Sequence, residues 1–150
     1  MPAVIGAELL VKDRVLAEEI RRRYHEAIGL PPAEAIGRGK GPYLVFGWRS
    51  GLATHGYIER LCGRILGENE VVSLSYGDLM SLGRACRLAK EGRCDEFPPP
   101  LMTRVVLGGY DYGDSDYAAE ASRTALFADV VEGVCGAEDA CYLYAPFRCQ

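Results

Sequence analysis

The first half of the chain alternates between apolar runs and one long amphipathic stretch. Residues 2–11 (PAVIGAELLV) are mostly apolar and end at a charged turn, which predicts a strand. Residues 42–48 (PYLVFGW) form a short apolar run bounded by turn residues, which is typical of a buried strand. Between these runs, residues 15–29 predict an amphipathic helix that Gly29 closes, because four apolar residues recur at every fourth position: Leu16, Ile20, Tyr24 and Ile28.

The middle of the chain contains one ambiguous segment and one clear helix. Residues 57–66 (YIERLCGRIL) fit a strand or a helix, and their weak alternation favours a strand preceded by a loop. Residues 73–92 predict a helix, because Ser75 followed by Asp78 resembles a capping box. The apolar face of this helix is expected to consist of Leu79, Leu82, Cys86 and Ala89.

The last third is expected to contain a strand pair, a short helix and a final extended segment. Residues 101–110 and 116–122 are interpreted as two strands on either side of an acidic loop. Together the segments predict an α/β fold with a mixed β-sheet flanked by helices. The domain is expected to span residues 1–123, and residues 124–150 are expected to form a C-terminal extension packed on it.

Composition narrows the class of protein. The net charge of −4 disfavours a protein that holds nucleic acid alone through phosphate contacts. The chain has no apolar run long enough for a membrane span and no basic start of a signal peptide, so we expect a cytoplasmic protein. Asn69 and Gln150 are its only side-chain amides, a depletion that suggests a thermophile.

The cysteines favour thiols or disulfides over a metal site. Intracellular disulfides occur in hyperthermophiles, so Cys135, Cys141 and Cys149 are candidates, paired as Cys141–Cys149 or Cys135–Cys141. The six cysteines lack the close pairs that a zinc site requires. The acidic loop lacks the spacing of a calcium loop, so no metal or cofactor is expected.

Three features of the sequence are considered as candidates for function. His55, in a glycine-flanked segment, could act as a general acid or base, although a lone loop histidine is more often a plain surface residue. The run Arg21–Arg23, with His25 beside it, is interpreted as a solvated helix face, and the sequence leaves open whether it contacts RNA. Residues 107–117 (LGGYDYGDSDY) carry more charge and aromatic surface than a turn requires.

Three stretches together resemble archaeal tRNA-splicing endonucleases. PYLVFGW resembles the strand before the active-site histidine of that family, and THGYIERLCGRILGENEVVSLSYGDLMSLGRACRLA resembles the segment from that histidine through a strand to a helix. TRVVLGGYDYGDSDYAAEAS resembles the closing hairpin with its acidic loop. The resemblance covers about residues 14–123 and implies the family's C-terminal nuclease-like α/β domain.

The resemblance implies a noncatalytic chain. The family cleaves RNA with a Tyr, a His and a Lys and needs no metal; here His55 matches the His, but the loop before PYLVFGW has no Tyr and the position of the Lys holds Cys94 or Glu91. Loss of one cooperating group removes most of a rate. His55 is therefore interpreted as a relic with a structural hydrogen bond, and no catalytic residue is expected.

The resemblance also implies partners. The chain is expected to be a structural subunit of a heterotetramer, two copies of each chain, that positions the catalytic endonuclease subunit on precursor tRNA. In that family an acidic loop docks on a neighbouring subunit, and the residues expected to do so here are Tyr110, Asp111, Tyr112, Asp114, Asp116 and Tyr117.

Two alternatives remain open. The chain could be an active metal-independent ribonuclease using His55 with Tyr43 and either Lys90 or Lys40. It could also be an unrelated interaction module whose acidic loop binds a basic protein.

Overall fold

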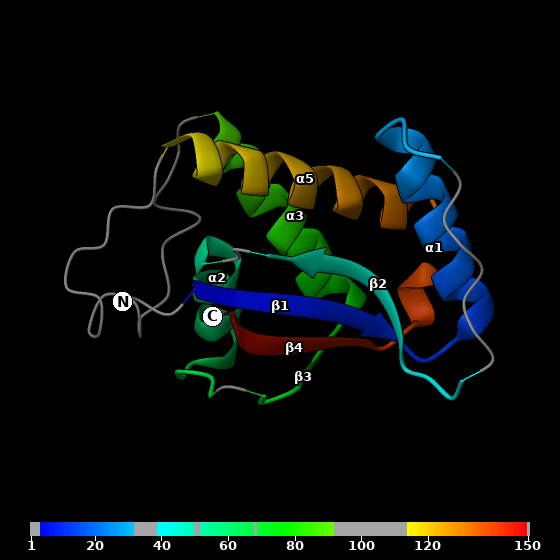
Figure 1. Cartoon of the computed structure of the whole chain (residues 1–150), viewed down its shortest axis with the longest axis horizontal. Helices are drawn as coiled ribbons and strands as arrows, with labels where there is room; N and C mark the ends of the chain where they lie inside the picture. Colours follow the sequence, from blue (N-terminus) through cyan, green and yellow to red (C-terminus); the bar gives the residue numbers. More distant parts are fainter. Residues whose placement is uncertain (1–3, 32–38, 50–51, 68, 92–113, 150) are drawn as a thin grey trace.

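The computed structural model describes residues 4–31, 39–49, 52–67, 69–91 and 114–149 as a four-stranded sheet with helices packed against it (Figure 1). All strand pairings in these ranges are antiparallel, in the order β2-β1-β4-β3, so the expected α/β class is confirmed but the sheet is not mixed. The elements are β1 (Val4–Val11), α1 (Arg14–Ala27), β2 (Tyr43–Trp48), α2 (Leu52–Cys62), β3 (Val72–Leu74), α3 (Tyr76–Lys90), α5 (Asp114–Glu132), the 3-10 helix η2 (Ala137–Asp139) and β4 (Tyr142–Cys149).

Helix α1 forms as its periodicity predicts. The Asp13 side chain accepts a hydrogen bond from the backbone N–H of Leu16 and caps the first turn. Gly29 follows the last turn at φ 74°, a left-handed conformation that favours glycine. The predicted apolar face is buried over Leu16, Ile20 and Tyr24.

Helix α3 also begins as predicted. Ser75 accepts from the backbone N–H of Asp78, and the Asp78 side chain accepts from the backbone N–H of Ser75, so the capping box is complete. All four residues of its predicted apolar face are buried: Leu79, Leu82, Cys86 and Ala89.

Two predicted strands are helical instead. Residues 57–62 belong to α2, which begins at Leu52, and residues 116–122 belong to α5. The buried positions of α2 have helical spacing, but three of them are the polar Thr54, His55 and Glu59, so the apolar periodicity of a helix is missing. Residues 116–122 are rich in alanine, the best helix former, and the strand interpretation disregarded this propensity.

The C-terminal residues are integral to the sheet. The expected domain boundary at residue 123 falls inside α5, and β4 lies between β1 and β3, paired with β1 from Val4↔Cys149 to Val11↔Tyr142. The first strand of the expected hairpin, residues 101–110, lies outside the described residues.

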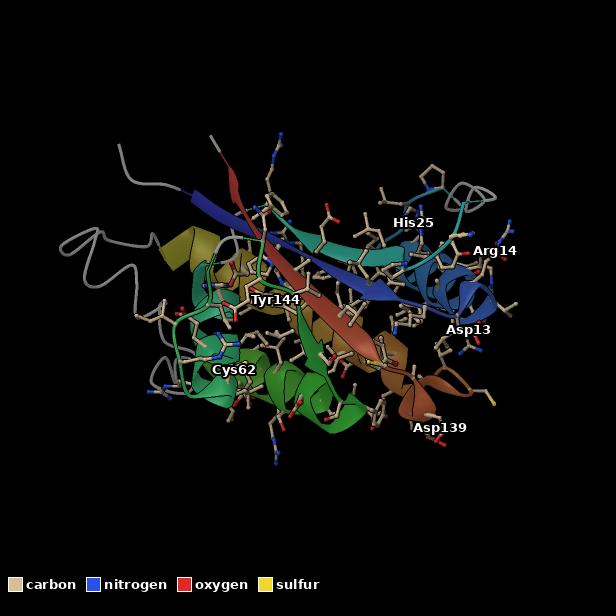
Figure 2. The ribbon with its side chains drawn as sticks, turned by 90° about the horizontal axis from the view of Figure 1, so that it is seen from below. Asp13, Arg14, His25, Cys62, Asp139 and Tyr144 are labelled. Atoms are coloured by element: carbon tan, nitrogen blue, oxygen red, sulfur yellow. The ribbon has the colours of Figure 1, made fainter. Side chains whose placement is uncertain are left out.

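One sheet face carries the core. Its inward side chains include Leu9, Trp48 and Tyr144, whereas alternate positions such as Glu8 and Leu10 face away from the helices. Helices α2, α3 and α5 lie on one side of the sheet, and no described element covers the other side (Figures 1 and 2). None of the helices in the described ranges combines the length and apolar content that crossing a bilayer requires.

Aromatic rings connect α1, β2 and α5 within this core. Phe46 of β2 stacks on Phe127 of α5 with ring centroids 4.4 Å apart, and Tyr24 of α1 meets both rings edge-on. Trp48 meets Phe46 edge-on at 4.9 Å, so the aromatic side chains of the predicted strand β2 pack together against the helices.

Helices α3 and α5 approach closely at a glycine. A Cβ atom added to Gly83 would lie 2.4 Å from the Cβ of Ala128, so only glycine permits this spacing. We predict that Gly83→Ala lowers the free energy of unfolding by about 1–3 kcal/mol, through overpacking that exceeds the gain in helix propensity. Denaturant unfolding measures the change.

Two further variants make this prediction specific. Ala128→Gly in the Gly83→Ala background should restore part of the loss, since it removes the opposing methyl group. Gly77→Ala in the same helix meets only ordinary contact at 3.6 Å and should not destabilise. Equal losses for Gly77→Ala and Gly83→Ala would contradict the packing argument.

Candidate functional site: a sealed polar cluster

The candidate site is a group of polar side chains buried between α2, α5 and β4. His55 and Glu120 are each 1% exposed, and Thr54, Glu59 and Tyr144 are completely buried. Polar groups at such depth must find hydrogen-bond partners, because burial without them costs several kcal/mol. Each member has a partner that the fold supplies.

Glu120 holds the first turn of α2. Its Oε2 accepts hydrogen bonds from the backbone N–H of Thr54 at 2.9 Å and from the Thr54 hydroxyl at 3.0 Å. The residue before α2 is Gly51, which has no side chain to cap the helix. A carboxylate from α5 therefore occupies the place of an N-cap, where negative charge also interacts favourably with the helix dipole.

Glu59 holds the other end of α2. Its Oε2 accepts a hydrogen bond from the backbone N–H of Leu66 at 2.9 Å, just beyond the last turn. The two buried carboxylates thus fix the beginning of α2 and the loop that follows it.

His55 lies between these anchors and contacts β4. Its Nδ1 is 2.7 Å from the hydroxyl of Tyr144, and its Nε2 is 3.6 Å from Oε2 of Glu59. Burial raises the pKa of the Tyr144 hydroxyl well above its usual value, so this group keeps its proton. We therefore assign Tyr144 as the donor to Nδ1, which leaves the Nε2 proton facing Glu59.

The imidazole is neutral at physiological pH. Burial lowers the pKa of His55 to about 4, so the contact with Glu59 is not an ion pair near pH 7. Tyr144 lies on the helix-covered side of β4, away from the uncovered sheet face (Figure 2).

Thr124 connects the cluster to β2. Its hydroxyl accepts a hydrogen bond from Trp48 Nε1 at 2.9 Å and donates one to the backbone carbonyl of Glu120 at 2.8 Å. Burial raises the pKa of the adjacent Cys86 thiol far above its usual value, so this cysteine stays uncharged. Three helices and two strands therefore meet at one hydrogen-bonded unit.

The geometry supports a structural role for His55. A general acid or base must reach the proton that it transfers, and an imidazole that is 1% exposed has no access to RNA. Sequence reasoning expected a structural hydrogen bond for His55, and the bond to Tyr144 confirms it. The expected position in a loop is wrong, because His55 lies within α2, at the start of its second turn.

The residues of the alternative ribonuclease are not brought together. Tyr43 begins β2 and its hydroxyl donates to the carbonyl of Gly39, beside the exposed Lys40. Trp48, five residues further along β2, is the end of the strand that reaches the cluster. At about 3.3 Å per residue, Tyr43 lies roughly 16 Å from that end.

The remaining predicted site residues lie elsewhere. Tyr110, Asp111 and Tyr112 are outside the described residues, and Asp114, Asp116 and Tyr117 lie in the first two turns of α5. Their docking role stays a prediction.

The predicted disulfides are not formed in this structure. Cys135 and Cys141 are exposed free thiols, and Cys149 is the last residue of β4. No group of His, Cys, Asp or Glu suited to a metal ion occurs in the described part of the chain.

Sequence reasoning missed the distant partners of His55 and Thr54. Tyr144 is 89 residues from His55, and Glu120, the partner of Thr54, was placed in a strand. One signal was available in α2: Thr54, His55 and Glu59 share a helix face with Ile58, which marks a face of mixed polarity once the segment is read as a helix.

Comparison of the chain with models of protein families, with curated proteins and with solved structures finds no match.

We predict that Glu120→Ala lowers the free energy of unfolding by about 2–4 kcal/mol, because the buried N–H and hydroxyl of Thr54 lose their acceptor. Glu132→Ala, at an exposed position of the same helix, is the control and should change stability by less than about 0.5 kcal/mol. Chemical denaturation of both variants measures the difference. A Glu120→Ala variant as stable as Glu132→Ala would refute the capping role.

The buried imidazole should also make stability depend on pH. In the unfolded chain His55 takes up a proton near pH 6.5, the usual pKa of a histidine in water, whereas in the folded chain its pKa is only about 4. The contribution of His55 is therefore complete above pH 6.5 and is lost as the pH falls to about 4, by about 3 kcal/mol. In His55→Gln this loss should be missing, so its stability relative to the wild type improves on acidification.

Tyr144→Phe is the matched control for this pH experiment. It removes the hydroxyl that contacts the imidazole but keeps the histidine, so it should be less stable than the wild type and retain the pH dependence. If the free energy of unfolding of His55→Gln and of the wild type changed with pH in parallel, the buried imidazole would be excluded as the cause of the pH dependence.

Proposed function

We propose that this chain is a noncatalytic structural subunit that assembles with a catalytic partner, and that the partner is the catalytic subunit of a tRNA-splicing endonuclease. The observation that carries the proposal is the burial of His55. The residue that the sequence resemblance aligns with a catalytic histidine is 1% exposed and bound to Tyr144. A chain that uses this position to hold its own helices cannot present the His55 imidazole to RNA.

The surface supports a role in assembly. The uncovered sheet face carries mostly apolar side chains that are partly exposed, among them Leu44 at 43%. Register places Leu10 between Leu44 and Leu143, which forms an apolar row across three strands. A face of this kind is typical of protein contact, where apolar area is removed from water.

The identity of the partner rests on sequence resemblance. Helix α5 takes the place of the second strand in the expected closing hairpin, and α2 takes the place of the expected strand after His55. These differences favour the second candidate, an interaction module unrelated to endonucleases. The same reconstitution experiment separates the two.

We predict that the isolated chain leaves an intron-bearing precursor tRNA uncut, and that cleavage begins when the catalytic subunit from the same organism is added. Native mass spectrometry should show two copies of each chain. His55→Gln, checked for folding, should retain cleavage within about threefold, because the imidazole acts only on stability.

Other outcomes would decide against the proposal. Cleavage by the chain alone, or a hundredfold loss in folded His55→Gln, would support the ribonuclease alternative. Failure of the two chains to assemble would favour the unrelated interaction module. Replacing Asp111, Asp114 and Asp116 with alanine tests the acidic segment separately: unchanged assembly and cleavage would exclude its docking role.

A further inference from the structure

A groove of about 340 Å³ lies between the edge strand β2 and the helices α1 and α5. Its helical wall carries three basic side chains, Arg21 and His25 from α1 and Arg123 from α5. Figure 2 shows His25 on α1, beside the ribbon of β2. None of these residues belongs to the sealed cluster around His55.

The two arginines of the groove have no acidic partner in the described part of the chain. Neither Arg21 nor Arg123 forms an ion pair there, although both are partly or fully exposed. Their neighbours differ: Arg22 pairs with Glu19 and Glu26, and Arg23 pairs with Glu19. Helix α1 thus neutralises Arg22 and Arg23 and leaves Arg21, beside the groove, without an ion-pair partner among the described residues.

The opposite wall is the edge strand β2, and α1 adds apolar side chains to the groove beside its basic ones. Leu44 is 43% exposed and Ile28 is 38% exposed, and Tyr24 and Phe46 lie deeper in the groove. Strand β2 pairs only with β1 among the described strands, so part of its backbone faces the groove rather than a neighbouring strand. The register shift between Leu9 and Leu10, which leaves Val45 without a partner, limits how long a strand could pair along this edge.

We infer that this groove binds a short extended segment of a partner protein in which acidic and apolar side chains alternate. Carboxylates of such a segment would form charge-assisted hydrogen bonds with Arg21 and Arg123. Its apolar side chains would cover Leu44 and Ile28, because successive side chains of an extended segment point to opposite sides. The inference rests on the proposed function only in taking the ligand to be a protein.

An RNA strand fits the groove less well. Phosphate binding requires several cations along the backbone, and this chain carries a net charge of −4. Phosphates would leave the apolar wall uncovered. A peptide with acidic and apolar side chains can contact both the arginines and the apolar wall.

The test measures binding of a fluorescent peptide in which glutamate alternates with leucine, by anisotropy with the full chain. Arg21→Gln combined with Arg123→Gln should weaken binding by about tenfold or more, since two charge-assisted contacts are lost. Arg64→Gln combined with Arg87→Gln is the matched control: it removes the same charge from arginines that pair with Glu70 and Asp129. The control should bind as the wild type does, and a peptide with lysine for glutamate should not bind.

The contrary results are equally specific. No binding of the acidic peptide, or equal weakening in both double variants, would overturn the inference. A single-stranded RNA oligonucleotide that binds the groove more tightly than the peptide, with loss in Arg21→Gln/Arg123→Gln, would identify the ligand as nucleic acid. If the chain self-associates through these arginines in sedimentation equilibrium, the occupant is a second copy.

The experiment is independent of the endonuclease assay. A groove variant that loses the peptide but still assembles with the catalytic subunit leaves the proposed function intact and shows that the groove is not its interface. If the chain binds the peptide but fails to assemble with that subunit, the inference about the groove stands and the proposed endonuclease function is rejected.

Discussion

The hydrogen bonds that buried side chains of α5 and β4 form with α2 are the constraint on which the rest of the structure depends. Glu120 accepts from Thr54 in the first turn of α2, and Tyr144 contacts His55, the next residue of the helix. Each of these groups would destabilise the fold if it were buried alone, and together they leave no member without a partner. A helix with a polar buried face thereby becomes a fixed part of the core.

The same burial explains why the polar cluster around His55 is suited to stabilising the fold rather than to catalysing a reaction. A tyrosine, a histidine and a glutamate in contact resemble a proton-transfer relay, but their depth keeps substrate away. The low pKa of the imidazole and the high pKa of the tyrosine both follow from desolvation, and both keep the groups uncharged where a charge would be costly. The surfaces that remain accessible to a partner include the uncovered sheet face and the groove beside Arg21 and Arg123.

The two surfaces have different chemistry and meet at Leu44. The sheet face is mostly apolar, whereas the groove adds Arg21 and Arg123 to an apolar wall. Apolar area contributes affinity with little selectivity, and unpaired cations select for an acidic partner and speed its approach. An assembly role needs both properties, and on this basis we propose a subunit function for this chain rather than catalysis.

The sequence by itself determined the elements whose signals are local. Helices α1 and α3 follow from apolar spacing and from capping residues that act within one turn, and β1 and β2 follow from short apolar runs. Only the tertiary structure decided α2 and the position of β4, because their stability comes from partners such as Glu120 and Tyr144 that lie 66 and 89 residues from the groups they bind. Hydrogen bonds over such distances leave no periodic trace along the chain, so a buried polar helix cannot be told from a half-exposed strand until the rest of the fold encloses it.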